Sequence, residues 1–259
     1  MKRLLAAAAL AAAAAQAAGA APPPALVERG KTLYGQYCVA CHGANGNGVA
    51  RRQERRIGAA PGRTQTEQIG IGPSLRGVGA LSADFYLRTG YMPLPHVGLQ
   101  PRRSRLILQE DQIRALTAYV ASLGHGPPVP TPHPERGSLS EGMRSFTDHC
   151  AGCHQVVAEG GYVTGAVPPP LEDATATQIA QAVRIGPYVM PAFSARAISD
   201  HELDSIIRYV EYAKHPDDRG GWSIGHVGPV PEGLVTWLIG MALLVAVCVV
   251  IGERLKRAG

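Results

Sequence analysis

The sequence predicts an all-α protein in which two small domains of the same design are followed by one membrane-spanning helix. Three observations predict this class. The pentapeptide Cys-x-x-Cys-His occurs twice, the same series of shorter motifs follows each copy, and an uncharged, largely apolar run occupies residues 234–251 near the C-terminus. Recurrence of several motifs in one order indicates a tandem repeat.

The first copy is predicted to span residues 26–124. Its pentapeptide runs from Cys38 to His42, and its last segment, from about 110 to 123, has apolar residues at helical spacing. Between these lie three short motifs: Pro73-Ser74-Leu75, Arg88-Thr89-Gly90 and Met92-Pro93. The apolar positions of the closing helix are Ile113, Leu116, Ala118, Val120 and Leu123.

The second copy is predicted to span residues 135–216, with its pentapeptide from Cys150 to His154. A closing helix is expected from about 200 to 214, where Ser199 and Glu202 form the pattern of a capping box. Its expected buried face consists of Leu203, Ile206, Ile207 and Val210. The intervening motifs are Pro169-Pro170-Leu171, Arg184-Ile185-Gly186 and Met190-Pro191.

Five prolines between Gly124 and Gly137 predict a stiff extended linker at 125–134. The two copies differ in length, because 31 residues separate the histidine from Pro-x-Leu in the first copy and 15 in the second. The first copy therefore carries an insertion. This insertion is either a docking surface for an acidic partner or a solvated loop, and its basic residues are Arg51, Arg52, Arg55, Arg56 and Arg63.

Both ends of the chain have the character of membrane-directed sequence. Residues 1–20 combine Lys2 and Arg3 with an Ala-rich apolar run, which predicts a secretory signal peptide or, alternatively, an uncleaved anchor. A transmembrane helix is expected at 234–252, after a Gly/Pro-rich tether at 217–233. Basic residues in the tail, 253–259, place the C-terminus in the cytoplasm and the two domains outside the cell membrane.

The formal net charge of +5 does not indicate a nucleic-acid-binding protein. Five of the 25 Lys and Arg residues lie in the terminal membrane-directed segments, whereas only one of the 20 Asp and Glu residues does. The intervening chain is therefore almost neutral, and it lacks the basic surface that nucleic acids require.

Duplicated Cys-x-x-Cys-His motifs predict two covalently bound haem c groups, one on Cys38 and Cys41 and one on Cys150 and Cys153. Two thiols three positions apart lie on one helical turn and can each bond one porphyrin, while the adjacent imidazole reaches the iron. A thioredoxin-type dithiol and a zinc site are the alternatives. Neither explains why histidine follows the second cysteine in both copies.

The expected axial ligands of the two irons are His42 with Met92 and His154 with Met190. The methionines occupy matching places in the two copies, and a thioether ligand raises the reduction potential of haem iron. The alternatives are His96 in the first copy, His149 in the second, or methionines that only fill a core. With both iron faces occupied no position is left for a substrate, so we expect an electron carrier with no catalytic residues of its own.

Several segments resemble the dihaem cytochrome c subunit, or cytochrome cc subunit, of actinobacterial-type cytochrome bc1 complexes. They are CVACHGANGNG, GPSLRGVGALSADFYLRTGYMP, CAGCH, VRIGPYVMPAF and GPVPEGLVTWLIGMALL. The resemblance implies a subunit of a proton-translocating quinol:cytochrome c reductase that receives electrons from a Rieske centre. It implies as partners cytochrome b, a Rieske iron–sulfur subunit and an aa3-type cytochrome c oxidase.

The same resemblance implies that the carbonyls of Pro73 and Pro169 accept the Nδ1 protons of the two haem-ligating histidines, and that Leu75 and Leu171 cover the porphyrins. Three other readings remain. They are a dihaem subunit of a cbb3-type oxidase, a dihaem peroxidase or thiosulfate-oxidising cytochrome, and a free-standing membrane-anchored dihaem cytochrome serving another dehydrogenase or oxidase.

Overall fold

A computed structural model describes residues 22–49, 72–94, 105–216 and 229–258 of the 259-residue chain. The predicted signal peptide, the Arg-rich insertion, His96 and most of the predicted tether lie outside these ranges. Within them the regular structure is helical, apart from one isolated β-bridge between Val163 and Ala166. The predicted all-α class is confirmed.

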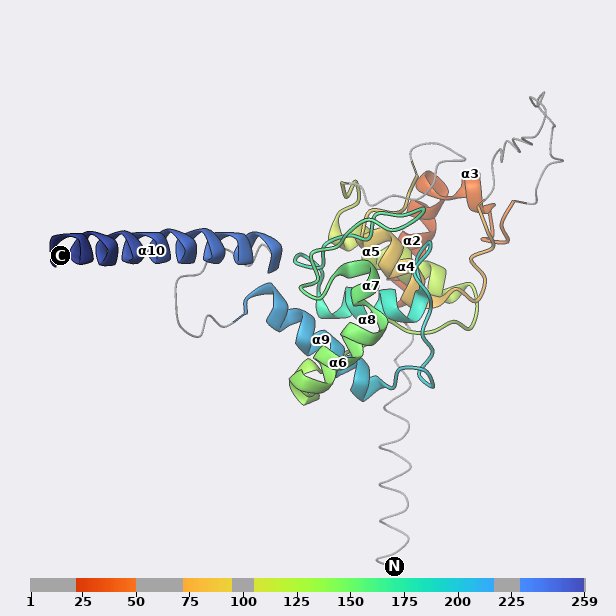
Figure 1. Cartoon of the computed structure of the whole chain (residues 1–259). Coiled ribbons are helices and arrows are strands. Elements are labelled where there is room, and N and C mark those ends of the chain that lie inside the picture. Colours follow the sequence, from red (N-terminus) through yellow and green to blue (C-terminus); the bar gives the residue numbers. More distant parts are fainter. Residues whose placement is uncertain (1–21, 50–71, 95–104, 217–228, 259) are drawn as a thin grey trace, which may run out of the picture.

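The helices of the two copies follow one another in the same order (Figure 1). In each copy a longer helix leads into a one-turn helix that contains the last four residues of the pentapeptide, and two further helices follow. The first copy contains α2 (Pro24–Tyr37), α3 (Val39–His42), α4 (Gly79–Arg88) and α5 (Glu110–Ser122). After the 3-10 helix η1 (Pro134–Arg136), the second contains α6 (Leu139–His149), α7 (Ala151–His154), α8 (Ala176–Ile185) and α9 (Asp200–Lys214).

The first and last helices of each copy cross at a glycine. A β-carbon on Gly30 of α2 would stand 2.0 Å from the carbonyl oxygen of Ala115 in α5, and one on Gly142 of α6 would stand 1.9 Å from that of Ser205 in α9. Only glycine permits backbones to approach this closely. Each crossing is therefore specified by one residue, which lies eight positions before the first cysteine of the pentapeptide.

The predicted core faces of the closing helices are confirmed, except that Leu123 lies just after α5 and is only partly buried. Ile113, Leu116 and Val120 are buried in α5, and all four predicted positions are buried in α9. The Ser199 side chain caps α9 by accepting a hydrogen bond from the Glu202 amide at 3.1 Å. The Glu202 carboxylate accepts a bond from Ser145 Oγ at 2.6 Å, so it joins α9 to α6.

The two copies pack against each other through α4 and α8. α4 contacts both α5 and α8 and buries residues on more than one face. Leu87 packs in the first core, whereas Asp84 contacts Gln181 of α8. The predicted linker contacts both copies: the Leu81 amide donates to Pro127 O at 3.0 Å, and the His133 amide donates to Asp204 Oδ1 at 2.7 Å.

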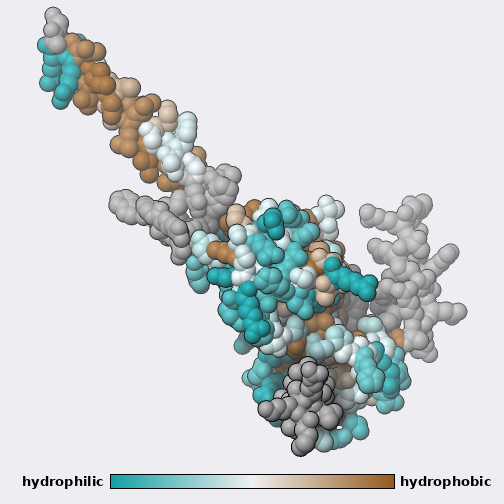
Figure 2. Space-filling model, turned by 90° about the horizontal axis from the view of Figure 1, so that it is seen from below, coloured by the Kyte–Doolittle hydropathy of each residue, from teal (hydrophilic) through white to brown (hydrophobic). Residues whose placement is uncertain are grey.

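The C-terminal helix α10 (Pro229–Ala258) is longer at both ends than the predicted span of 234–252. Its candidate membrane span, Gly233–Arg257, has 25 residues and would measure about 37 Å, enough to cross the roughly 30 Å hydrocarbon layer. Figure 2 shows this helix hydrophobic along most of its length, with a hydrophilic far end. α10 is a candidate membrane span.

Candidate functional site

A cavity in the second copy brings together the side chains that the pentapeptide and the Met-Pro motif predicted. Cys150, Cys153, His154 and Met190 all line it. Its empty volume, which includes open solvent at the mouth, is about 1250 Å³. Other lining residues are mainly apolar, among them Phe146, Leu171, Val183 and Ile206.

A backbone carbonyl orients the histidine at each pentapeptide. His154 Nδ1 lies 3.1 Å from Pro169 O, and His42 Nδ1 lies 2.7 Å from Pro73 O. Because a carbonyl oxygen can only accept, Nδ1 must carry the proton in both rings, and Nε2 keeps a free lone pair. Burial also lowers the pKa of His154, which favours the neutral imidazole that binds metals.

The Arg-x-Gly motif of the second copy holds the loop that carries Met190. Gly186 has φ +63°, and a β-carbon there would stand 2.4 Å from the Ala192 amide nitrogen and 2.7 Å from Met190 O. Arg184 donates to Phe193 O at 3.1 Å and to Ile198 O at 2.8 Å. The chain after α8 therefore turns back tightly and presents Met190 to the cavity.

His149, the alternative ligand of the second copy, also lines the cavity. Its ring lies against Phe193, with a centroid separation of 5.9 Å. The cavity thus contains both candidate ligands, and only Met190 has a counterpart in the first copy.

In the first copy Cys38, Leu75 and Met92 all pack against one core, which includes Tyr34 and Leu116. The Met92 amide donates to Tyr86 O at 2.9 Å, which fixes the backbone beside this side chain. Arg88 pairs with the carboxylates of Asp84 and Glu110, whereas its counterpart Arg184 pairs with one carboxylate, that of Asp200, and donates to two backbone carbonyls. The two Arg-x-Gly motifs are thus alike in sequence and different in their contacts.

The thiols do not have the properties of a redox-active dithiol. Burial, with a smaller effect of the neighbouring cysteine, raises the pKa of Cys38 to about 11 and that of Cys150 to about 11. Thioredoxin-type chemistry needs a lowered thiol pKa. A zinc site shared by both pairs does not fit either, because Cys38 packs against the first core and Cys150 against the second.

The residues of the second cavity fit a c-type haem. Two thiols stand one helical turn apart, an imidazole is held with Nε2 free, and a thioether enters from a separate loop. Cysteine pairs suit covalent attachment, and histidine with methionine suits the two axial positions of an iron. Leu171, expected over the porphyrin, also lines the cavity.

Three lining residues come from the first copy and were not predicted from the sequence. Phe85 and Thr89 belong to the α4 region, and Tyr91 follows it. They precede the second pentapeptide by about 60 residues. Thr89 belongs to the Arg88-Thr89-Gly90 motif, but that motif was assigned to the first copy and not to the second haem site. Only the packing of α4 against α8 brings them to this cavity.

Comparisons with known proteins agree with the two-domain organisation. The family model described as "Cytochrome c" matches residues 27–124, and the model described as "Cytochrome C oxidase, cbb3-type, subunit III" matches residues 137–210. A reducing HAO-like protein complex from Kuenenia stuttgartiensis aligns with a TM-score of 0.33 at 19% identity, over 72% of this chain and 96% of that one. This structural likeness is too low to support an argument.

Curated relatives are similar over most of the chain. The cytochrome bc1 complex cytochrome c subunit of Corynebacterium diphtheriae is 35% identical, over 89% of this chain and 82% of the relative. The Mycobacterium bovis protein of the same name is 35% identical, over 89% and 79%. A cbb3-type cytochrome c oxidase subunit CcoP from an Azospirillum strain is 28% identical, over 70% and 60%.

The bc1-type relatives are thus matched at higher identity and over more of the chain than the cbb3-type relative. The predicted fold class, two cytochrome c-type domains followed by one candidate C-terminal membrane helix, is confirmed. This chain belongs to the family of cytochrome bc1 complex cytochrome c subunits.

Proposed function

We propose that this chain is the dihaem electron-transfer subunit of a quinol:cytochrome c reductase of the bc1 type. The observation that carries the proposal is the cavity at which Cys150, Cys153, His154 and Met190 converge. Family membership supports it, since the relatives are named as subunits of such a complex. The chain alone turns over no substrate, and its contribution is to carry electrons.

Eight residues hold the two cofactors in this proposal. The cysteines of each pentapeptide form thioether bonds to one haem c, and a histidine and a methionine ligate its iron. The covalent positions are Cys38, Cys41, Cys150 and Cys153, and the axial ligands are His42, Met92, His154 and Met190. Bound haem supplies an iron that gains and loses a single electron.

The polypeptide around these positions tunes and protects the site. The carbonyls of Pro73 and Pro169 fix the two imidazoles. The hydrogen bond from Nδ1 also makes Nε2 a stronger electron-pair donor to a metal. Apolar side chains such as Phe146 and Ile206 line the second cavity. Apolar surroundings and a thioether ligand both favour the reduced iron, which suits a carrier of high potential.

The proposed domain arrangement keeps the predicted boundaries: 1–20 for the signal peptide or anchor, 26–124 and 135–216 for the haem domains, and 234–252 for the membrane span. Glu253 and the tail cations Arg254, Lys256 and Arg257 follow the span. By the positive-inside rule, we place the tail in the cytoplasm and both haem domains on the opposite side of the cell membrane.

Cytochrome b and a Rieske iron–sulfur protein are the proposed partners within the complex, and an aa3-type oxidase is the proposed acceptor. Membership in the bc1 family supports the first two. Purification in mild detergent tests this assembly. Co-purification of cytochrome b and a Rieske protein is expected, whereas recovery of a lone dihaem protein would favour a free-standing cytochrome, and recovery with a cbb3 oxidase would favour the CcoP-like alternative.

Cofactor number is tested with cysteine variants of the full chain, by haem staining after denaturing electrophoresis and by intact mass. Cys38→Ala/Cys41→Ala and Cys150→Ala/Cys153→Ala should each remove one haem. Cys248 lies in α10, far along the chain from both pentapeptides, so Cys248→Ala is the matched control and should retain two. A wild-type chain with no covalent haem, made in a host that attaches haem c, would refute the proposal.

A further inference from the structure

We propose that the first domain completes the haem site of the second domain, so that the two domains form one redox unit. Phe85, Thr89 and Tyr91 from the first domain line the same cavity as His154 and Met190. The identity of the occupant rests on the function proposed above. The sharing of the cavity wall is independent of that identity.

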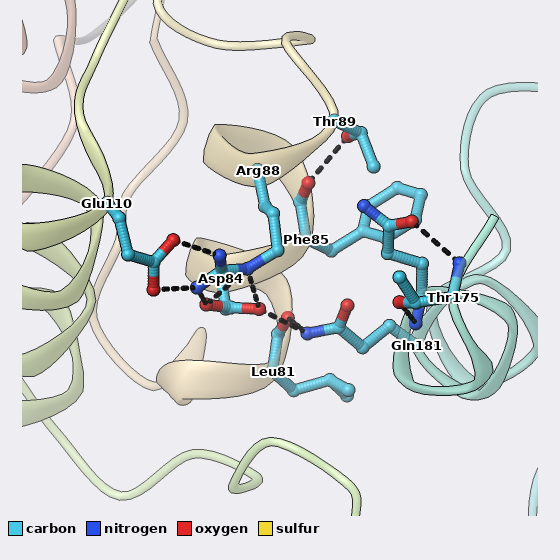
Figure 3. A network of polar contacts seen from close by, with 9 residues as sticks. Leu81, Asp84, Phe85, Arg88, Thr89, Glu110, Thr175 and Gln181 are labelled. Carbon is cyan, nitrogen blue, oxygen red and sulfur yellow. Dashed lines mark hydrogen bonds and ion pairs between the residues drawn. The ribbon is translucent and has the colours of Figure 1, made fainter. Parts of the chain in front are cut away.

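A buried polar contact holds the shared wall in place (Figure 3). Gln181 of α8 is fully buried, and its Nε2 donates to Asp84 Oδ2 at 2.9 Å. The same nitrogen lies 3.4 Å from Leu81 O, so it contacts α4 at two points. The buried Gln181 Nε2 and the buried Asp84 carboxylate are paired, whereas Gln181 Oε1 has no hydrogen-bond partner among the described residues. The pairing favours one docking position, because other positions would leave the amide nitrogen and the carboxylate without each other as well.

Contacts within the first domain also hold the Asp84 side chain in position. Arg88 binds it with Nη2 at 2.9 Å and with Nε at 3.2 Å, and Glu110 of α5 pairs with the same guanidinium. This arrangement raises the pKa of Arg88, since both carboxylates stabilise its charge. Three helices, α5, α4 and α8, are therefore joined by one continuous set of polar contacts (Figure 3).

Phe85 lies one residue after Asp84, so the contact that docks the domains also positions the wall. The Phe85 and Tyr91 rings stack with centroids 6.1 Å apart and an interplanar angle of 21°. Tyr91 is followed directly by Met92, the proposed ligand of the first haem. The dipeptide Tyr91-Met92 of the first domain therefore borders both proposed haem sites.

This placement predicts how the second haem responds to changes in the first domain. Oxidised haem iron carries one more positive charge than reduced iron, so water in the cavity stabilises the oxidised form. Removing an aromatic ring from the wall should admit water and lower the midpoint potential of the second haem. A substitution that weakens the docking of the two domains should also lower this midpoint potential, because the first-domain residues that line the cavity would all move away from it.

The test uses the full-length two-haem protein and spectroscopic redox titration. Phe85→Ala is compared with Tyr86→Ala, because the Tyr86 ring contacts Phe85 and Tyr91 but lies outside the cavity lining. Met190→His identifies the signals of the second haem. We expect Phe85→Ala to lower the second midpoint potential and alter its absorption band, with a clearly smaller effect of Tyr86→Ala.

Gln181→Met provides a second route that does not alter a cavity residue. It removes the donor to Asp84 with little change of volume, and it should also lower the second midpoint potential. If both haems are attached and the second haem is unchanged in Phe85→Ala and Gln181→Met alike, the inference is wrong while the proposed function stands. A wild-type chain without two haems would instead refute the proposed function.

Discussion

Gly30 of α2 lies against the carbonyl oxygen of Ala115 so closely that a β-carbon at position 30 would stand 2.0 Å from that oxygen. Gly35 is on the same helix, and a β-carbon there would meet nothing within 4 Å. These two glycines form a matched pair for separating helix packing from helix propensity.

Gly30→Ala should destabilise the protein by about 1–3 kcal/mol, because α2 and α5 must move apart. Gly35→Ala should stabilise it by about 0.5–1 kcal/mol, because alanine favours the helix. Denaturant unfolding of the two-haem protein measures both. Equal effects of the two substitutions would contradict the packing role of Gly30.

Gly186→Ala should release Met190 from the second haem. Alanine at φ +63° costs about 1–2 kcal/mol, and its β-carbon would also collide with Ala192 and with the Met190 carbonyl. We expect the oxidised second haem to lose its methionine-to-iron charge-transfer band. Gly165→Ala is the control, since Gly165 has φ +85° with nothing within 4 Å, and it should keep the band.

Tyr34 should give the protein an alkaline limit of stability. Its hydroxyl donates to Gly43 O at 2.7 Å, and burial raises the pKa of Tyr34 from 10.0 to about 12. The folded state holds this proton more tightly than the unfolded state, so the stabilisation is complete below pH 10 and is lost as the pH rises towards 12.

Tyr34→Phe should therefore lower the free energy of unfolding by about 1 kcal/mol at pH 7, because one hydrogen bond is missing. Between pH 10 and 12 the variant should lose less stability than the wild type does. Unfolding free energies measured across this range provide the check. Parallel pH profiles for the two proteins would show that Tyr34 does not cause the alkaline loss.

Deleting residues 217–259 should release the haem domains from washed membranes with both haems still attached. The deletion removes α10 and leaves α2 to α9 intact. Cell fractionation followed by haem staining is the measurement, and Trp237→Ala, which keeps the apolar stretch, is the membrane-bound control. Continued membrane binding of the truncated chain after a high-salt wash would show that α10 is not the main anchor.

Sequence reasoning predicted the features that repeat. The pentapeptides, the Met-Pro motifs and the buried faces of α5 and α9 follow from local patterns that occur twice, and the structure groups Cys150, Cys153, His154 and Met190 at one cavity. Gly30 and Gly142 also repeat, eight positions before each first cysteine. Closer alignment of the two copies would have found them.

The contacts between the copies could not be predicted in the same way. Asp84 and Gln181 lie in corresponding helices, α4 and α8, and 97 residues separate them. Neither residue is repeated at the matching position of the other copy. Nothing in the local sequence marks Phe85 and Tyr91 as neighbours of the second haem site. Their place beside the second cavity depends on tertiary packing, which has no local pattern.

The wall that Phe85 and Tyr91 contribute to the second cavity has a consequence for biosynthesis. α4 is made before the second pentapeptide, and once it is docked its residues form part of the wall of the second cavity. The surroundings of a haem attached at Cys150 and Cys153 should therefore be complete only after α4 has docked onto α8.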